Sequence, residues 1–292
     1  MIKEWSADSF QLDLPEIYQI EAASGCNLNC KTCIRSNVRV KRPVGFIDTD
    51  LVRKMVDRGD FNNSYFVELQ MYGEPLLHPK LYDLIQIVKS SSCKVGLSTN
   101  GVLLSKRLKE ISSLDYLTIS IDSANADTYQ EMRGYKLDDI VRDVSLVLSQ
   151  QKVPKVDLQV INFWGKEDEL PALIRLSEDK GWNVICRAVP DCFAAYQGRP
   201  YPEYRISGLC VNPWMSVSVH WDGDVVPCCF SAGKHVVYGN LNQENLCQIW
   251  NNSVERRKLM TRMKTSQDLM PCSKCYMRSP ALFHLRMLKE AI

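Results

Sequence analysis

Two hydrophobic periods alternate along the first two-thirds of the chain. Six short runs are apolar or alternate between apolar and polar residues, and their β-branched and aromatic content predicts strands. The predicted strands are 16–23, 65–72, 94–100, 116–122, 155–162 and 182–190. Between these runs, apolar residues recur every three or four positions, which predicts helices. The predicted helices are 48–59, 79–91, 103–114, 137–151 and 166–181.

Strands that alternate with helices indicate a parallel sheet with right-handed crossovers. A closed (β/α)8 barrel needs eight such units, whereas this pattern stops after six, near residue 190. We therefore expect an α/β fold in which residues 1–190 form a partial (β/α)6 barrel resembling a TIM barrel. In such barrels the reactive groups gather at the carboxyl ends of the strands.

The pattern changes after Pro190. Residues 191–209 are rich in Pro, Gly and Tyr, which indicates a loop or linker. Residues 216–230 then read as a β-hairpin with Asp222–Gly223 at its turn. An amphipathic helix is predicted over 245–265 and a last helix over 281–291. We expect residues 191–292 to form a small second domain.

The composition is that of an ordinary globular protein, with 45% hydrophobic and 24% charged residues. A net charge of +2 argues against nucleic acid as the main partner. No apolar run approaches the length of a membrane span, and the first sixteen residues contain no apolar signal-peptide core. We therefore expect a cytoplasmic protein with no membrane partner.

Twelve cysteines are many for a reducing compartment, where disulfides are rare, and they point to metal binding. Cys93 and Cys186 lie in strand-like surroundings and can be explained as buried thiols. The four histidines show no metal-ligand spacing among themselves, and no role is assigned to them.

Cys26, Cys30 and Cys33 form a Cys-x3-Cys-x2-Cys segment directly after the first predicted strand. Three thiolates on a 4Fe–4S cube leave one iron open for a substrate or cofactor atom. The alternative is a zinc site whose fourth ligand lies elsewhere. The spacing and its place after a first strand resemble the radical S-adenosylmethionine (radical SAM) superfamily. That resemblance implies that the open iron binds S-adenosylmethionine (SAM), whose reductive cleavage gives a 5′-deoxyadenosyl radical that abstracts hydrogen from substrate.

Further motifs support this resemblance at the ends of successive predicted strands. "MYGEP" (71–75) is similar to the family's Gly-Gly-Glu-Pro motif, with Tyr72 in place of the first glycine. The family also often has an aromatic residue where this chain has Thr32. By resemblance, the candidate SAM-binding residues are Gly73, Glu74, Pro75, Ser98, Asn100, Ser120, Asp122 and Arg133. Glu68 and Gln70 lie on the second predicted strand, from which they could reach the barrel interior, and they receive no assignment.

A second, dispersed set of cysteines lies in the last third of the chain. Its candidate ligands are Cys210, Cys228, Cys272 and Cys275, with Cys229 and Cys247 as further candidates. The surrounding sequence resembles the SPASM auxiliary-cluster domain in its short "twitch" form, with spacing similar to that of the family member 2-deoxy-scyllo-inosamine dehydrogenase. This resemblance implies a second, fully ligated 4Fe–4S cluster that serves electron transfer. A zinc site remains the alternative here as well.

The resemblance implies an enzyme with two possible outcomes. In an oxidation, the auxiliary cluster accepts the electron of the substrate radical; in an epimerisation, a cysteine returns a hydrogen atom. Cys229 is a packed thiol, a hydrogen donor or a ligand, in that order of preference, and Cys192 is a rival donor. Adjacent residues on a strand point to opposite faces, so we do not expect Cys228 and Cys229 both to bind one cube.

The expected substrate is a sugar or aminocyclitol, with a ribosomally made peptide as the alternative. Only 25 residues precede Cys26, fewer than a separate leader-peptide-binding domain needs, and this favours the small molecule. An external one-electron donor such as flavodoxin or ferredoxin is the expected protein partner. The alternative of another class is a zinc-binding structural or interaction protein.

Overall fold

The computed structural model describes residues 13–33, 35, 42–150, 152–162, 169–190, 210, 212–229, 231, 236–264, 272 and 275. Within them, one nine-stranded sheet has the order β6-β5-β4-β3-β2-β1-β7-β8-β9. Its first six strands are β1 (Glu16–Ile20), β2 (Phe66–Glu68), β3 (Lys94–Thr99), β4 (Tyr116–Ser120), β5 (Lys155–Asn162) and β6 (Ile185–Pro190). Neighbours among these six pair in parallel. The predicted α/β fold with an unclosed partial barrel is confirmed.

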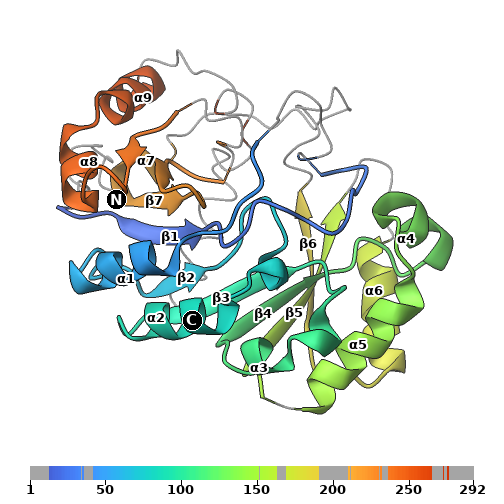
Figure 1. Ribbon diagram of the computed structural model, residues 1–292. Helices are drawn as coiled ribbons and strands as arrows, with labels where there is room; N and C mark the ends of the chain where they lie inside the picture. The colour runs from blue at the N-terminus through green and yellow to red at the C-terminus, as the bar shows by residue number, and fades with distance from the viewer. Residues whose placement is uncertain are drawn as a thin grey trace, which may run out of the picture.

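Helices cover the outer face of this parallel sheet (Figure 1). They are α1 (Thr49–Asp57), α2 (Leu81–Lys89), α3 (Leu108–Ile111), α4 (Ala126–Arg133), α5 (Leu137–Ser149) and α6 (Glu169–Asp179), with short 3-10 turns η3 (Pro75–Leu77) and η4 (Leu104–Lys106). The predicted start of the first helix is confirmed, because the side chain of Asp48 accepts a hydrogen bond from the Asp50 backbone N–H. A core of aliphatic side chains fills the space between helices and sheet.

The helix predicted over 103–114 is wrong in its extent. The structure has η4 and the four-residue α3 there, separated at Arg107, whose backbone leaves the helical region at φ −127° and ψ 31°. The guanidinium of Arg107 donates a hydrogen bond to the carbonyl oxygen of His78, 29 residues away, and it also forms a local ion pair with Glu110. The contact with His78 is the one that the local helical periodicity does not encode. Helix α4 lies where no helix had been assigned.

The C-terminal part contributes α7 (Asn212–Met215), β7 (Ser216–Val219), β8 (Asp224–Val226), β9 (Gly239–Asn240), α8 (Leu246–Asn252) and α9 (Val254–Lys264). The predicted hairpin is confirmed, since β7 and β8 pair antiparallel and Gly223 takes a left-handed φ of +86° at the turn. The single helix predicted over 245–265 is two helices that break at Ser253, whose hydroxyl accepts a hydrogen bond from the Arg256 N–H.

Strand β7 pairs in parallel with β1 along four register positions, so the hairpin continues the sheet of the barrel. The predicted domain boundary falls after β6, where a segment outside the described residues begins, and it stays a prediction. The predicted last helix and Cys192 also lie outside the described residues. In the part of the chain that the structure describes, no helix is both long and apolar enough to cross a membrane.

Candidate active site

The first three cysteines lie on a loop at the carboxyl end of β1. Ser24 anchors its start by donating its hydroxyl to the Pro43 carbonyl and accepting the Gly45 N–H, both at 2.9 Å. At the other end, the Cys33 N–H bonds to the Cys30 carbonyl at 3.1 Å. Burial raises the pKa of Cys30 to about 11, and negative charge on Cys33 and Cys26 adds to the rise. The three sulfur atoms are therefore near neighbours whose protons a metal cluster would displace.

The sulfur atoms of Cys26, Cys30 and Cys33 are not gathered as closely as the ligands of one zinc ion. Zn–S bonds of about 2.3 Å place the sulfur atoms of one tetrahedral site about 4 Å apart. Among the described residues, the only trio of metal-binding groups whose ligand atoms lie within 4.8 Å of one another is His220, Asp222 and Asp224. The sulfur atoms of Cys26, Cys30 and Cys33 therefore do not all lie within 4.8 Å of one another.

The Gly-Glu-Pro segment is clamped against the cysteine loop. A Cβ on Gly73 would lie 2.1 Å from the Ala23 carbonyl oxygen, so only glycine fits this approach. The next residue, Glu74, donates its backbone N–H to the Gly25 carbonyl at 2.7 Å. Its buried carboxylate accepts from the Leu76 N–H, the Thr99 hydroxyl and the Asn100 N–H. Burial nevertheless raises the pKa of Glu74 above its ordinary value. A carboxylate has about four lone-pair positions, so one remains for a ligand donor.

Asn100, at the end of β3, connects the Gly-Glu-Pro segment to Cys26. Its side-chain amide donates to the sulfur of Cys26 at 3.5 Å and to Oδ1 of Asn27 at 2.8 Å. The side-chain oxygen Oδ1 of Asn100 accepts a hydrogen bond from the Val102 N–H. The structure therefore brings Asn100 directly onto Cys26, a predicted cluster ligand.

Asp122 and Arg133 form a buried ion pair beside the same loop. Nη2 of Arg133 lies 2.7 Å from Oδ2 of Asp122, and the two side chains are 7% and 1% exposed. The charge of Arg133 also opposes the rise in the pKa of Cys30, which places the pair near that sulfur. The backbone carbonyl of Met132, in the same helix, accepts the Lys31 N–H. Helix α4 thus supports the cysteine loop from outside.

Ser98 and Ser120 are half-buried on β3 and β4, in neighbouring strands. The hydroxyl of Ser98 donates to Oε1 of Glu68 at 2.6 Å. Glu68 had no predicted role, and this contact brings it into the site.

The second cysteine set is also brought together. Burial raises the pKa of Cys228 well above its ordinary value, and negative charge on Cys229, Cys210, Cys275 and Cys272 adds to the rise. The other three predicted ligands, Cys210, Cys272 and Cys275, therefore each lie within electrostatic range of Cys228. Cys247, the further candidate, is exposed on α8.

Cys229 lies where the two sites meet. It packs against a small buried cluster formed by Met71, Tyr72 and Val226. The argument that a strand would turn Cys228 and Cys229 to opposite faces is wrong, because β8 ends at Val226 and both cysteines follow it in a bend. Tyr72 directly precedes the Gly-Glu-Pro segment, so this packing joins the auxiliary set to the predicted SAM loop.

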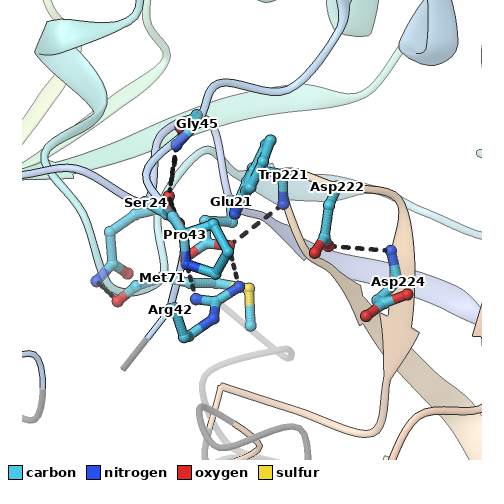
Figure 2. A network of polar contacts seen from close by, with 10 residues as sticks. Glu21, Ser24, Arg42, Pro43, Gly45, Met71, Trp221, Asp222 and Asp224 are labelled. Atoms are coloured by element: carbon cyan, nitrogen blue, oxygen red, sulfur yellow. Dashed lines mark hydrogen bonds and ion pairs between the residues drawn. The ribbon is translucent and has the colours of Figure 1, made fainter. Parts of the chain in front are cut away.

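A polar network between β1 and the hairpin was missed from the sequence (Figure 2). Arg42 forms two hydrogen bonds with the fully buried carboxylate of Glu21, which also accepts the Trp221 N–H. The guanidinium of Arg42 lies 5.1 Å from the centre of the Tyr72 ring. The one available signal was an acidic residue at the end of an apolar strand run, at Glu21.

Family models match both parts of the chain. Residues 20–152 match the model of the radical SAM superfamily, and residues 210–276 match the SPASM iron–sulfur cluster-binding domain. These matches imply SAM, a 4Fe–4S cluster and an auxiliary iron–sulfur cluster as cofactors, which confirms the predicted cofactors. The cysteines just described offer the thiolate ligands that such clusters need.

Two proteins of known function are similar in sequence. The chain is 26% identical to the tungsten-containing aldehyde ferredoxin oxidoreductase cofactor-modifying protein of Pyrococcus furiosus, over 90% of this chain and 88% of that protein. It is 24% identical to neomycin C epimerase of Streptomyces fradiae, over 73% of this chain and 78% of the epimerase.

Solved structures share the fold. SuiB of Streptococcus suis bound to its precursor peptide SuiA superposes with a TM-score of 0.67 and 12% identity, over 85% of this chain and 67% of SuiB. BtrN in complex with AdoMet and 2-DOIA gives a TM-score of 0.59 and 18% identity, over 90% of this chain and 93% of BtrN. Together with the fold and the two cysteine sets, the family models show that this chain is a radical SAM enzyme with a C-terminal SPASM domain.

Proposed function

We propose that the enzyme oxidises or epimerises a sugar or aminocyclitol at a carbon bearing a hydroxyl or amino group. Cys26, Cys30 and Cys33 would hold the SAM-binding cluster. The auxiliary cluster would be held by Cys210, Cys228, Cys272 and Cys275. The observation that carries the proposal is the juxtaposition of two cysteine sets across β1 and the hairpin, with Tyr72 and Cys229 packed between them.

When bound, the cluster and SAM supply an adenosyl radical that takes a hydrogen atom from a substrate carbon. The chain's own residues would position these groups. Glu74 has one lone-pair position left for the SAM ammonium, and Gly73 permits the close approach of the backbone. Pro75, Ser98, Asn100 and Ser120 would line the same strand ends. The Asp122–Arg133 pair would set the charge beside Cys30.

The role of Cys229 decides between epimerisation and oxidation. Its packing against Tyr72, next to the Gly-Glu-Pro segment, favours a place from which a thiol could donate hydrogen to a substrate radical. If it does not donate, the neighbouring auxiliary set favours electron transfer and therefore oxidation. Cys192, the other proposed donor, lies outside the described residues.

The similar proteins support different substrate classes. The name of neomycin C epimerase and the 2-DOIA in the BtrN complex favour a small ring compound. The SuiB complex with a precursor peptide supports the alternative of peptide modification. In either case a one-electron donor such as flavodoxin or ferredoxin would supply the electron.

The test begins with anaerobically purified protein, which should be brown and contain about eight irons and eight sulfides per chain. Cys30→Ala should lose the SAM-binding cluster and all release of 5′-deoxyadenosine from SAM, whereas Cys228→Ala should lose only the auxiliary cluster. Cys93→Ala, which removes a buried thiol outside both sets, should keep the full iron content. A colourless protein containing zinc, or SAM cleavage that persists in Cys30→Ala, would overturn the proposal.

The outcome is tested in deuterated water with Cys229→Ala. Loss of deuterium incorporation into product, with an oxidised product trapped instead, would support epimerisation with Cys229 as donor. Unchanged turnover and unchanged deuterium content would remove Cys229 from the mechanism.

A further inference from the structure

Glu68 occupies the inner face of the parallel sheet. On β2 and its continuation, Val67 and Leu69 are fully buried in the hydrophobic core, while Glu68 between them is half-buried. Because successive side chains of a strand point to opposite faces, Glu68 points away from the helices and into the barrel interior. Figure 1 shows the helices on the other side of this sheet.

Two neighbouring strands orient the Glu68 carboxylate. Gln19 on β1 is its register partner and donates Nε2 to Oε2 of Glu68 at 3.1 Å. Ser98, two residues before Asn100 on β3, donates its hydroxyl to Oε1 at 2.6 Å. The carboxylate therefore lies next to the strand ends that line the proposed SAM site, and its direction is fixed by two hydrogen bonds.

The Glu68 carboxylate is held by hydrogen bonds from neutral side chains in the described part of the chain. Within the described part of the chain, no lysine, arginine or histidine forms an ion pair with Glu68. Two buried acids of the molecule, Glu21 and Asp122, are instead each paired with an arginine, and the buried Glu74 accepts three hydrogen bonds. A carboxylate out of bulk water costs free energy unless a positive group compensates it. Each Glu68 oxygen accepts one bond and retains a further lone-pair position.

Gln19 gives a second, independent indication of a ligand. The residue is only 5% exposed, and among the described residues its Oε1 has no hydrogen-bond partner. Since Nε2 is directed at Glu68, Oε1 is left as an acceptor for a donor group of a bound molecule. The site thus offers a carboxylate for a cation and an amide oxygen for an N–H or O–H donor.

We propose that Glu68 binds the ammonium group of the substrate, with Gln19 accepting a hydrogen bond from the same group or from an adjacent hydroxyl. This inference rests on the proposed function and narrows its substrate class to ring compounds that carry a primary amine. Ser98 acts as a positioning residue that holds the carboxylate in place. Glu68 is a specificity-determining residue, because a neutral amide in place of the amine loses the charge on which its binding depends.

The test measures binding by equilibrium dialysis with two pairs of probes: glucosamine with N-acetylglucosamine, and 2-DOIA with its N-acetylated form. The wild-type protein, loaded with iron and SAM, should bind the amine of at least one pair tenfold or more tightly than its neutral partner. Glu68→Gln should abolish this preference, and Glu68→Asp, which keeps the charge, should retain part of it. Glu255→Gln, which removes an exposed carboxylate paired with Lys258, should behave as wild type.

The outcomes separate the inference from the function on which it rests. Wild-type protein that cleaves SAM but shows no preference for either amine would overturn the inference and leave the radical chemistry standing. A preference that survives in Glu68→Gln, with normal iron content, would also overturn it. Absence of SAM cleavage in wild-type protein would instead contradict the proposed function. A preference for a lysine peptide over its acetylated form, lost in Glu68→Gln, would support the ammonium site and move the substrate to the peptide class.

Discussion

Arg42 and Glu21 form a bidentate ion pair, with 2.6 Å between Nη1 and Oε1 and 2.8 Å between Nη2 and Oε2. Glu21 follows β1, Arg42 follows the cysteine loop, and the same carboxylate accepts the Trp221 N–H from the hairpin. Three segments far apart in the sequence therefore meet at one buried charge. The SPASM hairpin is joined to the barrel by polar contacts as well as by the sheet.

Replacing Arg42, the positive partner of Glu21, should lower the free energy of unfolding. In Arg42→Ala the Glu21 carboxylate stays buried without its cation, which typically costs about 3–5 kcal/mol of unfolding free energy. Denaturant unfolding followed by fluorescence measures the loss. The control is Lys258→Ala, which breaks an exposed ion pair and should change stability by about 0.5 kcal/mol or less. If Arg42→Ala loses no more unfolding free energy than Lys258→Ala, Arg42 does not compensate the buried charge of Glu21.

Stability should fall with rising pH because of Glu21. Burial raises the pKa of its folded-state carboxyl above the ordinary 4.5. Below pH 4.5 the group is protonated in both states and its contribution is fully present. As the pH rises through the folded-state pKa, the unfolded chain has already released its proton, so this contribution is lost. The difference in unfolding free energy between wild type and Glu21→Gln should therefore decline as the pH rises from 4.5; a constant or rising difference would refute the assignment.

Gly45 and Trp221 should be coupled energetically. A Cβ on Gly45 would lie 2.1 Å from the Trp221 ring, so Gly45→Ala forces that ring to move. Overpacking of this kind costs about 1–3 kcal/mol. The double variant with Trp221→Ala removes the clash, and adding Gly45→Ala to Trp221→Ala should then cost clearly less than adding it to wild type. Additive effects in unfolding experiments would show that the two residues do not share this contact.

Asn100 should tune the first cluster through its N–H donation to Cys26. Hydrogen bonds to a ligating sulfur stabilise the reduced cluster, so Asn100→Ala should lower its reduction potential in an EPR-monitored redox titration. Loss of such an outer contact typically lowers activity about 10- to 100-fold, here measured as SAM cleavage. Asn251→Ala is the matched control, because that amide donates to the exposed sulfur of Cys247 at 3.3 Å. Equal potentials in the two variants would count against the role of Asn100.

The strands and cysteine sets could be predicted because their signals are local. Strand β5 occupies the predicted range of 155–162, and the Cys26–Cys33 segment follows β1 as expected. The prediction of one helix over 103–114 was wrong because Arg107 bonds to the distant carbonyl oxygen of His78, a contact that periodicity does not encode. The argument about Cys228 and Cys229 failed because β8 stops two residues before them.

The polar contacts of the site could not be predicted from the sequence, for a different reason. Glu68 could be placed on the second strand, but its bonds to Gln19 and Ser98 depend on the register of three strands. The pairing of Glu21 with Arg42 and Trp221 depends on how the hairpin joins the sheet. Such relationships arise between elements, so a single sequence read along its length does not reveal them.

The parallel pairing between β1 and β7 makes the C-terminal hairpin part of the same sheet as the barrel strands. A chain truncated before β7 would leave the backbone N–H and C=O groups along one side of β1 without partners, and an open strand edge of this kind invites pairing with other chains. Separating β7 from the barrel would therefore also expose the edge of β1, the strand that leads into the Cys26–Cys33 loop.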